Sequence, residues 1–398
     1  MAHEDLAPET LSQLAVVTRL GGLEVVEEIA ADWARLCDEV RSCEPFYRPE
    51  WILAYLRAFA PKTQVIVLSA WADGLLRGVL PLVRRKMRIC GLPVSVLTCP
   101  ANAHSSRFGL VRCAGKEGED VLRLIWRHVK EIPGWNLFHA PFVMEGNGID
   151  QFLSLAAAEG YPVARRRSWQ SLYLPLNSIE VEQPAWLAET RPKFRKNLRR
   201  TLRQLEELGS VTVRHHDTAE PEALEHFYRL ESSGWKGKQG TAIACDPQTQ
   251  QFYDEIAQAA ARHGYLSLDF LELNGKPISG FFAFNHGGRY FLTKAGYDET
   301  YQRFGTGQLL AHEILKNSEA RGIRELDFVA AATWDEGRWA SARRTHYQVF
   351  IFQKGFYGSL LHALRIPCRE IVKKILGRGV DEGKPLELLS PPGNSENE

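Results

Sequence analysis

A short segment that contains two glycines, Gln302–Gly307, has the residue types and spacing of an anion-binding turn. It follows a stretch with strand-like alternation and opens a stretch with helical periodicity. Gly305 and Gly307 have no side chains, so a ligand can approach the backbone, where free N–H groups and the helix dipole favour negative charge. The spacing differs from that of a P-loop and from the G-x-G-x-x-G fingerprint. We therefore expect a diphosphate at this turn; a plain loop or helix cap is the alternative.

The same segment fits the pattern Q/R-x-x-G-x-G/A, and in this it resembles the pyrophosphate-binding motif of GNAT acyltransferases. In that family the motif joins the fourth strand of a mostly antiparallel meander to a helix, and the next strand splays away to admit the pantetheine arm of coenzyme A. The element order expected over 265–330 is similar. The resemblance implies that acetyl-CoA or another acyl-CoA binds as co-substrate, through contacts from Gln302, Arg303, Phe304, Gly305, Thr306, Gly307, Thr293 and Lys294.

Further segments in both halves carry the pattern of a narrower family. They are Pro45-Phe46, Glu50-Trp51, Gly78–Leu82, Phe194–Arg200, Leu205–Gly209, Gly234–Gly237, Gly240–Ala242 and Tyr297-Asp298. Together they resemble the CelD-like or BcsL-like acyltransferases, a family linked by name to cellulose biosynthesis and built as tandem GNAT domains related to the Fem-type peptidyltransferases. The resemblance covers 45–352 and implies transfer of an acyl group from a CoA thioester to an amine, on a sugar or a cell-envelope or exopolysaccharide precursor.

One pair of positions departs from that family's pattern. Members often carry a Tyr–Lys pair eight and nine residues after the strand aspartate, ahead of a tryptophan. Here Asp327 and Trp339 keep the spacing, but Asp335 and Glu336 occupy the positions of the pair. Because two acids replace a cation, we assign no substrate contact by analogy to that lysine. A non-catalytic scaffold is one alternative, and a Fem-type transferase that uses aminoacyl-tRNA is another; the intact glycine motif argues for catalysis.

Acyl transfer to an amine needs a base for the ammonium group, a donor for the carbonyl oxygen and an acid for the departing thiolate. Glu231 and Asp327 are the candidate bases and Tyr347 the candidate acid. The resemblance implies that a main-chain N–H near Thr293 is the oxygen donor. Each side chain also has a structural alternative: Glu231 as a solvated helix end, Asp327 as a cap or arginine partner, and Tyr347 as a core aromatic.

Two basic segments are candidate acceptor-binding elements. Arg199 lies in the cationic run 191–203, whose interleaved apolar residues predict an amphipathic helix. Such a face could attract an anionic acceptor or the 3′-phosphate of CoA, or could simply be solvated. Trp235 and Lys236 begin a glycine-containing loop that could close over the acceptor, with an ordinary surface loop as the alternative.

Composition and residue spacing exclude several classes of partner and cofactor. The formal net charge is +1 and no aromatic residues interleave the basic run as a stacking platform, so nucleic acid is not expected as a partner. The cysteines form no C-x-x-C pair and the histidines no H-x-x-x-H pair, so we expect no metal. No run of about 18 apolar residues or signal peptide is present. We expect a cytoplasmic monomer or homodimer that acts on a small-molecule amine or sugar-linked acceptor.

Hydrophobic periodicity predicts an α/β (α+β) protein with two tandem GNAT-like domains, each a mixed, mostly antiparallel sheet flanked by helices. The first, 1–170, lacks the pyrophosphate motif, and the second, 171–355, carries it. Both follow a hairpin–helix–strand order, as a duplication would. Segment 356–379 is basic and amphipathic, so it either packs on the second domain or contacts a membrane surface. Segment 380–398 is expected to be disordered.

Overall fold

The computed structural model describes residues 14–40, 44–176, 192–331, 339 and 342–364. Their strands form one continuous 13-stranded sheet in the order β1-β2-β3-β4-β6-β13-β7-β12-β11-β10-β9-β8, with β5 beside β3. The strands are β1 (Ala15–Gly21), β2 (Val65–Ala72), β3 (Leu75–Ile89), β4 (Leu92–Thr98), β5 (Val111–Arg112), β6 (Leu137–Met144), β7 (Val163–Pro175), β8 (Val211–His216), β9 (Leu266–Leu273), β10 (Lys276–His286), β11 (Arg289–Tyr297), β12 (Glu325–Ala331) and β13 (Ala342–Phe352).

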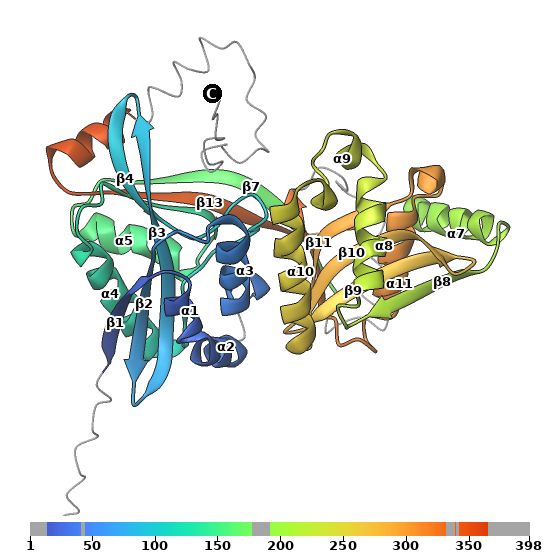
Figure 1. The fold of residues 1–398 in the computed structure, drawn as a ribbon, viewed down its shortest axis with the longest axis horizontal. Coiled ribbons are helices and arrows are strands. Elements are labelled where there is room, and N and C mark those ends of the chain that lie inside the picture. The colour runs from blue at the N-terminus through green and yellow to red at the C-terminus, as the bar shows by residue number, and fades with distance from the viewer. Residues whose placement is uncertain (1–13, 41–43, 177–191, 332–338, 340–341, 365–398) are drawn as a thin grey trace, which may run out of the picture.

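Helices flank this sheet in both halves (Figure 1). They are α1 (Glu24–Glu27), α2 (Ala30–Glu39), α3 (Pro49–Phe59), α4 (Gly115–Glu131), α5 (Gly148–Ala158), α7 (Pro192–Glu206), α8 (Pro221–Ser232), α9 (Trp235–Lys238), α10 (Pro247–Arg262) and α11 (Thr306–Lys316), with short 3₁₀ turns η1 (Pro45–Tyr47), η2 (Ile243–Cys245) and η3 (Glu299–Phe304). The predicted fold class, a mixed and mostly antiparallel α/β structure, is confirmed.

Local sequence rules account for many element ends. Asp73-Gly74 and Asn274-Gly275 adopt positive φ angles of 51° and 73° and of 52° and 75°, as two-residue hairpin turns require. Asp246 caps α10 by accepting the backbone N–H groups of its first turn. The two turns place β2 against β3 and β9 against β10 in antiparallel register.

The two halves repeat one arrangement. In the first half an antiparallel meander ends in β4, α4 follows, and β6 pairs with β4 in parallel. In the second half the meander ends in β11, α11 follows, and β12 pairs with β11 in parallel. This repetition agrees with the duplicated layout expected from the sequence.

Two long strands join the halves. β7 runs through the expected junction and pairs with β12 at its C-terminal end, and β13 pairs with β7 along its length and with β6 (Figure 1). The sequence analysis assigned no element to β13, β1 or β8. The limits 1–170 and 171–355 remain predictions, because a chain segment from the end of the second half completes the sheet of the first.

The tail begins on the first half, not on the second half as the packing alternative expected. Residues 356–364 are helical, and Leu361 is buried beside Val94, Leu137 and Phe352. The remainder of 356–379 and all of 380–398 lie outside the described residues. Within the part of the chain that is described, no helix is long and apolar enough to cross a membrane.

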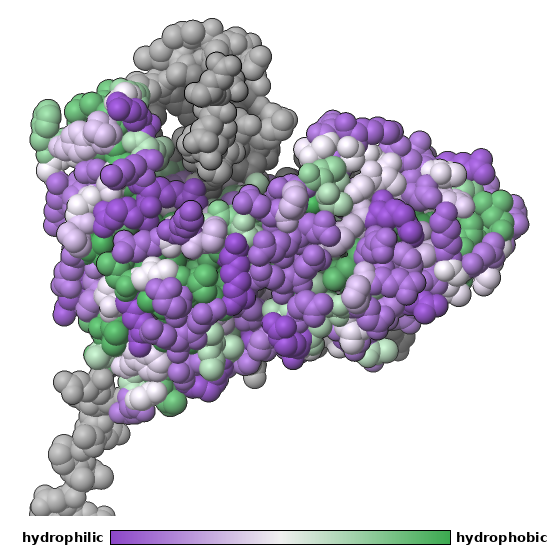
Figure 2. Space-filling view, in the orientation of Figure 1, coloured by the Kyte–Doolittle hydropathy of each residue, from purple (hydrophilic) through white to green (hydrophobic). Residues whose placement is uncertain are grey.

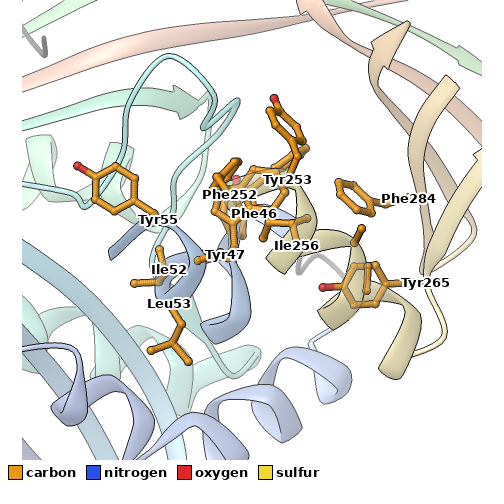
Figure 3. Close-up of a cluster of buried hydrophobic side chains, with 14 of the residues drawn as sticks. Phe46, Tyr47, Ile52, Leu53, Tyr55, Phe252, Tyr253, Ile256, Tyr265 and Phe284 are labelled. Carbon is orange, nitrogen blue, oxygen red and sulfur yellow. The ribbon is translucent and has the colours of Figure 1, made fainter. Parts of the chain in front are cut away.

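An aromatic cluster packs the two halves together (Figure 3). α3 lies against α10, and Trp51 meets Phe252 and Phe284 at ring-centroid distances of 5.3 and 5.8 Å. Phe46 meets Phe291 of β11 at 5.7 Å, edge to face. Such fully buried aromatic pairs fix both distance and orientation. The surface over α8 and α10, in contrast, is mostly hydrophilic (Figure 2).

Candidate active site

The glycine segment forms a turn that leaves backbone donors free. η3 ends at Gly305, whose φ of 59° is left-handed, and α11 starts at the next residue. The carbonyl of Gly305 accepts the N–H groups of Gln308 and Leu309 at 2.9 and 3.1 Å. Because these are the first bonds of the helix, the N–H groups of Thr306 and Gly307 precede its hydrogen-bond ladder and have no acceptor within it.

Among the residues that the structure describes, little stands in front of these donors. A Cβ atom built on Gly307 would come no closer than 3.9 Å to its neighbours, Phe281 and Ser279. The hydroxyl of Thr306 is buried and has no hydrogen-bond partner in the described part of the chain. No acidic residue stands in the first turn of α11. An open backbone, a free buried hydroxyl and the positive end of a helix fit a diphosphate.

The other residues of the motif have different positions. Gln302 and Arg303 are exposed, and the guanidinium of Arg303 lies 4.7 Å from the ring of Phe304. Phe304 is buried in the core beneath α11. Its role is therefore to anchor the turn, whereas Gln302 and Arg303 are free to contact a ligand from outside.

β11 and β12 separate beside this turn. Their parallel pairing covers three positions and ends at Phe291 and Asp327. Beyond that point β11 continues to Tyr297 against β10 alone, and β12, which already pairs with β7 on its other edge, continues beside β7 alone. The resemblance to GNAT domains led us to expect a splay of this kind, and the structure contains it.

A bulge marks β11 within the splay. Phe282 of β10 faces Lys294, while the next residue faces Leu292, so Thr293 is an extra residue. The hydroxyl of Thr293 donates to the carbonyl of Phe282 at 2.6 Å. A bulge re-aims main-chain groups, and here it does so at the strand edge that has lost its partner. Thr293 and Lys294, which the sequence analysis expected to contact the co-substrate, therefore lie at this strand edge.

Glu231 and two lysines form a cluster on the face of the sheet that α8 and α10 cover. Glu231 is 3% exposed and accepts hydrogen bonds from the ammonium of Lys236 at 2.9 Å and from the N–H of Ile243 at 2.8 Å. It is therefore not the solvated helix end considered as an alternative. Burial lowers the pKa of Lys236 and of Lys294, and the nearby Glu231 carboxylate opposes this shift.

Two contributors to the cluster escaped the sequence analysis. A Cβ atom at Gly296 would lie 2.5 Å from the backbone nitrogen of Glu231, so the close approach of α8 to β11 requires glycine. A glycine inside a strand pattern is the sequence signal for such an approach. From the first half, His104 lies 3.4 Å from the hydroxyl of Tyr253, whose ring is 5.6 Å from the ammonium of Lys294. Burial, then the charge of Lys294, lowers the pKa of His104 to about 4, and Asp246 opposes them.

Two predicted catalytic residues are not brought to this cluster. Asp327 is fully buried, and its carboxylate bonds Arg107, Arg344 and a backbone N–H, which corresponds to the structural alternative. Tyr347 lies under the guanidinium of Arg165 at 3.5 Å and donates to Glu145, both in the first half. Both side chains are bonded to charged groups that lie outside the Glu231 cluster.

The predicted acceptor-binding residues are distributed. Lys236 belongs to the Glu231 cluster, and Arg199 is exposed on α7, which packs beside α11. Trp235 begins α9, but its side chain lies outside the described residues, as do Asp335 and Glu336. No group of three metal-binding side chains occurs in the ranges that the structure describes.

Residues 192–363 match the family model of the acetyltransferase (GNAT) domain. The second half of the chain is therefore similar to a GNAT-type acetyltransferase domain. No curated protein matches the sequence. The CelD-like or BcsL-like resemblance stays a prediction.

Solved structures resemble most of the chain, across both halves. FemX has a TM-score of 0.56 at 11% identity, over 86% of this chain and 98% of that one. The C-terminal DUF2156 domain assigned to a lysylphosphatidylglycerol synthetase of Agrobacterium fabrum has a TM-score of 0.50 at 12% identity, over 87% and 97%. A tandem GNAT protein from the clavulanic acid pathway aligns over 86% of this chain and 100% of that one at 13% identity, with a TM-score of 0.43. At these identities the likeness concerns the fold alone.

Proposed function

We propose that this protein is an N-acyltransferase that moves an acetyl or longer acyl group from acyl-CoA to an amine, on a small molecule or a sugar-linked cell-envelope precursor. The observation that carries this proposal is the open glycine turn at the start of α11, directly beside the gap between β11 and β12. The N–H groups of Thr306 and Gly307 and the Thr306 hydroxyl would hold the diphosphate. The pantetheine arm would follow the gap.

The residues of the opposite sheet face suit the acceptor. The amine nitrogen would attack the thioester carbon, the carbon–sulfur bond would break, and the proton lost by the amine would reach the departing thiolate. Main-chain N–H groups at the Thr293 bulge would stabilise the carbonyl oxygen. Glu231 is the proposed base, because its carboxylate is buried at this face and the ammonium of Lys236, 2.9 Å away, would orient it.

Titration of the full chain with acetyl-CoA, free CoA and aminoacyl-tRNA tests this proposal. A CoA species at 100 times its Kd should raise the unfolding free energy by about 2.7 kcal/mol, seen as a higher melting temperature. The Gly305→Arg variant, which fills the turn, should lose this rise. Stabilisation by aminoacyl-tRNA alone would favour the Fem-type alternative, and no response to any CoA species would refute acyl-CoA as the donor.

A further inference from the structure

β12 leaves β11 through one residue with an unusual backbone, Val329. Its φ is 55°, in the left-handed region that a β-branched side chain disfavours, and the residue is 2% exposed. Asp327 and Ala331 are four positions apart on β12, but their β7 partners, Tyr173 and Ser171, are only two apart. The extra backbone is therefore accommodated at Val329, where the gap for the proposed co-substrate opens.

The carboxylate of Asp327 holds this conformation. One of its oxygens accepts the N–H of Val329 at 2.8 Å, which closes a short side-chain-to-backbone turn. Asp327 is also the last residue of β12 that pairs with β11. The bond that turns the strand therefore starts at the end of the parallel ladder.

Two arginines fix that carboxylate. Arg107, from the segment between β4 and β5 in the first half, lies 2.8 Å from both oxygens of Asp327, and Arg344 of β13 lies 2.9 Å from one. The side chains of Arg107 and Asp327 are both fully buried. Charged hydrogen bonds in such a site are short and strongly oriented, so the carboxylate has one available position.

The same network reaches β11. Glu44 of the first half accepts Arg107 at 2.9 Å and Arg289, the first residue of β11, at 2.8 Å. Both strands are thus tied to the first half at the narrow end of the gap. The first half contains no pyrophosphate motif, but it contributes the charges that hold the strands of the second half.

We propose that Arg107 and Asp327 are positioning residues for the acyl-CoA gap: Arg107 fixes the carboxylate of Asp327, which holds Val329 left-handed and keeps β12 away from β11. This inference rests on the proposed function. The first half then supports the strands of the second half through these charges, and it does so without contacting the ligand itself.

A glycine rescue in the full chain tests the inference. Arg107→Met should weaken CoA binding about tenfold, because the carboxylate loses its fixed position. Glycine adopts a positive φ without help from the Asp327 carboxylate. The CoA affinity of Arg107→Met/Val329→Gly should therefore recover to within about threefold of that of the wild type. Arg107→Met/Val329→Ala is the matched control: it also removes the two methyl groups of the valine but keeps the Cβ, so it should not rescue. Isothermal titration with free CoA measures all four proteins.

The outcomes separate the possibilities. Rescue by glycine and not by alanine supports the inference, whereas wild-type affinity in Arg107→Met, rescue by both or rescue by neither overturns it. If circular dichroism shows that Arg107→Met is unfolded, Arg107→Lys replaces it in the same series. If the wild type binds no CoA, the proposed function fails, and amide exchange along β12 decides the inference: faster exchange in the Arg107 variant, reversed by glycine at 329, supports it, and unchanged exchange overturns it.

Discussion

In both halves a glycine with a left-handed φ stands where a helix follows the meander, and the backbone after that glycine is more crowded in the first half. α4 begins at Gly115, and α11 begins at the residue after Gly305. A Cβ atom at Gly118 would lie 2.0 Å from the carbonyl oxygen of Cys113, whereas one at Gly307 would come no closer than 3.9 Å to any neighbour. Glu117 stands in the first turn of α4, and no acid stands in that of α11. The start of α11 is therefore the better candidate of the two for binding an anion.

The space beside the parallel strand also differs between the two halves. Phe142 of β6 has a φ of 59°, as Val329 of β12 has 55°. In the first half the N–H of Phe108 donates to the carbonyl of Phe142 at 3.2 Å, and Phe108 is 3% exposed. The chain itself thus fills the gap of the first half. The comparison teaches that a duplicated fold loses or keeps a binding site according to what occupies the gap beside its parallel strand.

Substituting one glycine in each half should give the largest effects and test the comparison most directly. Gly118→Ala should lower the unfolding free energy by about 3 kcal/mol, because its methyl group overlaps a backbone oxygen, and should leave the CoA affinity of the folded protein unchanged. Gly307→Leu should keep its stability, since leucine is a good helix former, and lose at least about 1.4 kcal/mol of CoA binding, a tenfold change. Urea unfolding and calorimetric titration measure the two quantities. Loss of both in either variant would contradict the assignment.

The junction between the halves should respond to pH through His104. Burial and then Lys294 lower its folded pKa from 6.5 to about 4, against the opposing charge of Asp246. The unfolded chain therefore binds a proton that the folded chain does not, and stability falls as pH drops from about 6.5 to about 4. His104→Gln should remove about 1–2 kcal/mol of this dependence. His128→Gln, on α4 away from the junction, is the control, and equal pH profiles for both variants would contradict a special role for His104.

The smallest expected effect concerns two buried hydroxyls. Thr306→Val should weaken CoA binding by about 1 kcal/mol, since it removes a donor for the diphosphate, and should not destabilise the free protein. Thr98→Val, at the end of β4 in the first half, should leave CoA binding unchanged. The pair is compared by titration calorimetry and thermal unfolding. Equal affinities for CoA would mean that the Thr306 hydroxyl does not face the ligand.

The sequence predicted most helices and hairpins because their signals are local. It also selected Gly305, Gly307 and Glu231 as candidate site residues, since motif spacing and helix ends can be read from neighbouring residues. It did not identify β13, whose partners β6 and β7 are distant in the chain. It left Asp327 with two alternatives, because an isolated aspartate carries no sign of the two arginines that surround it.

What the sequence determined by itself is the placement of turns and the glycine motif, since a positive φ is cheap only for glycine and a few polar residues. The tertiary structure decided which glycine turn stays open, which carboxylate is buried in an ion-pair network, and which histidine enters the junction. His104 and Tyr253 are 149 residues apart and meet only because α10 packs on the first half. Burial and long-range pairing set these properties, because the charge state and the freedom of a side chain depend on neighbours that local sequence does not specify.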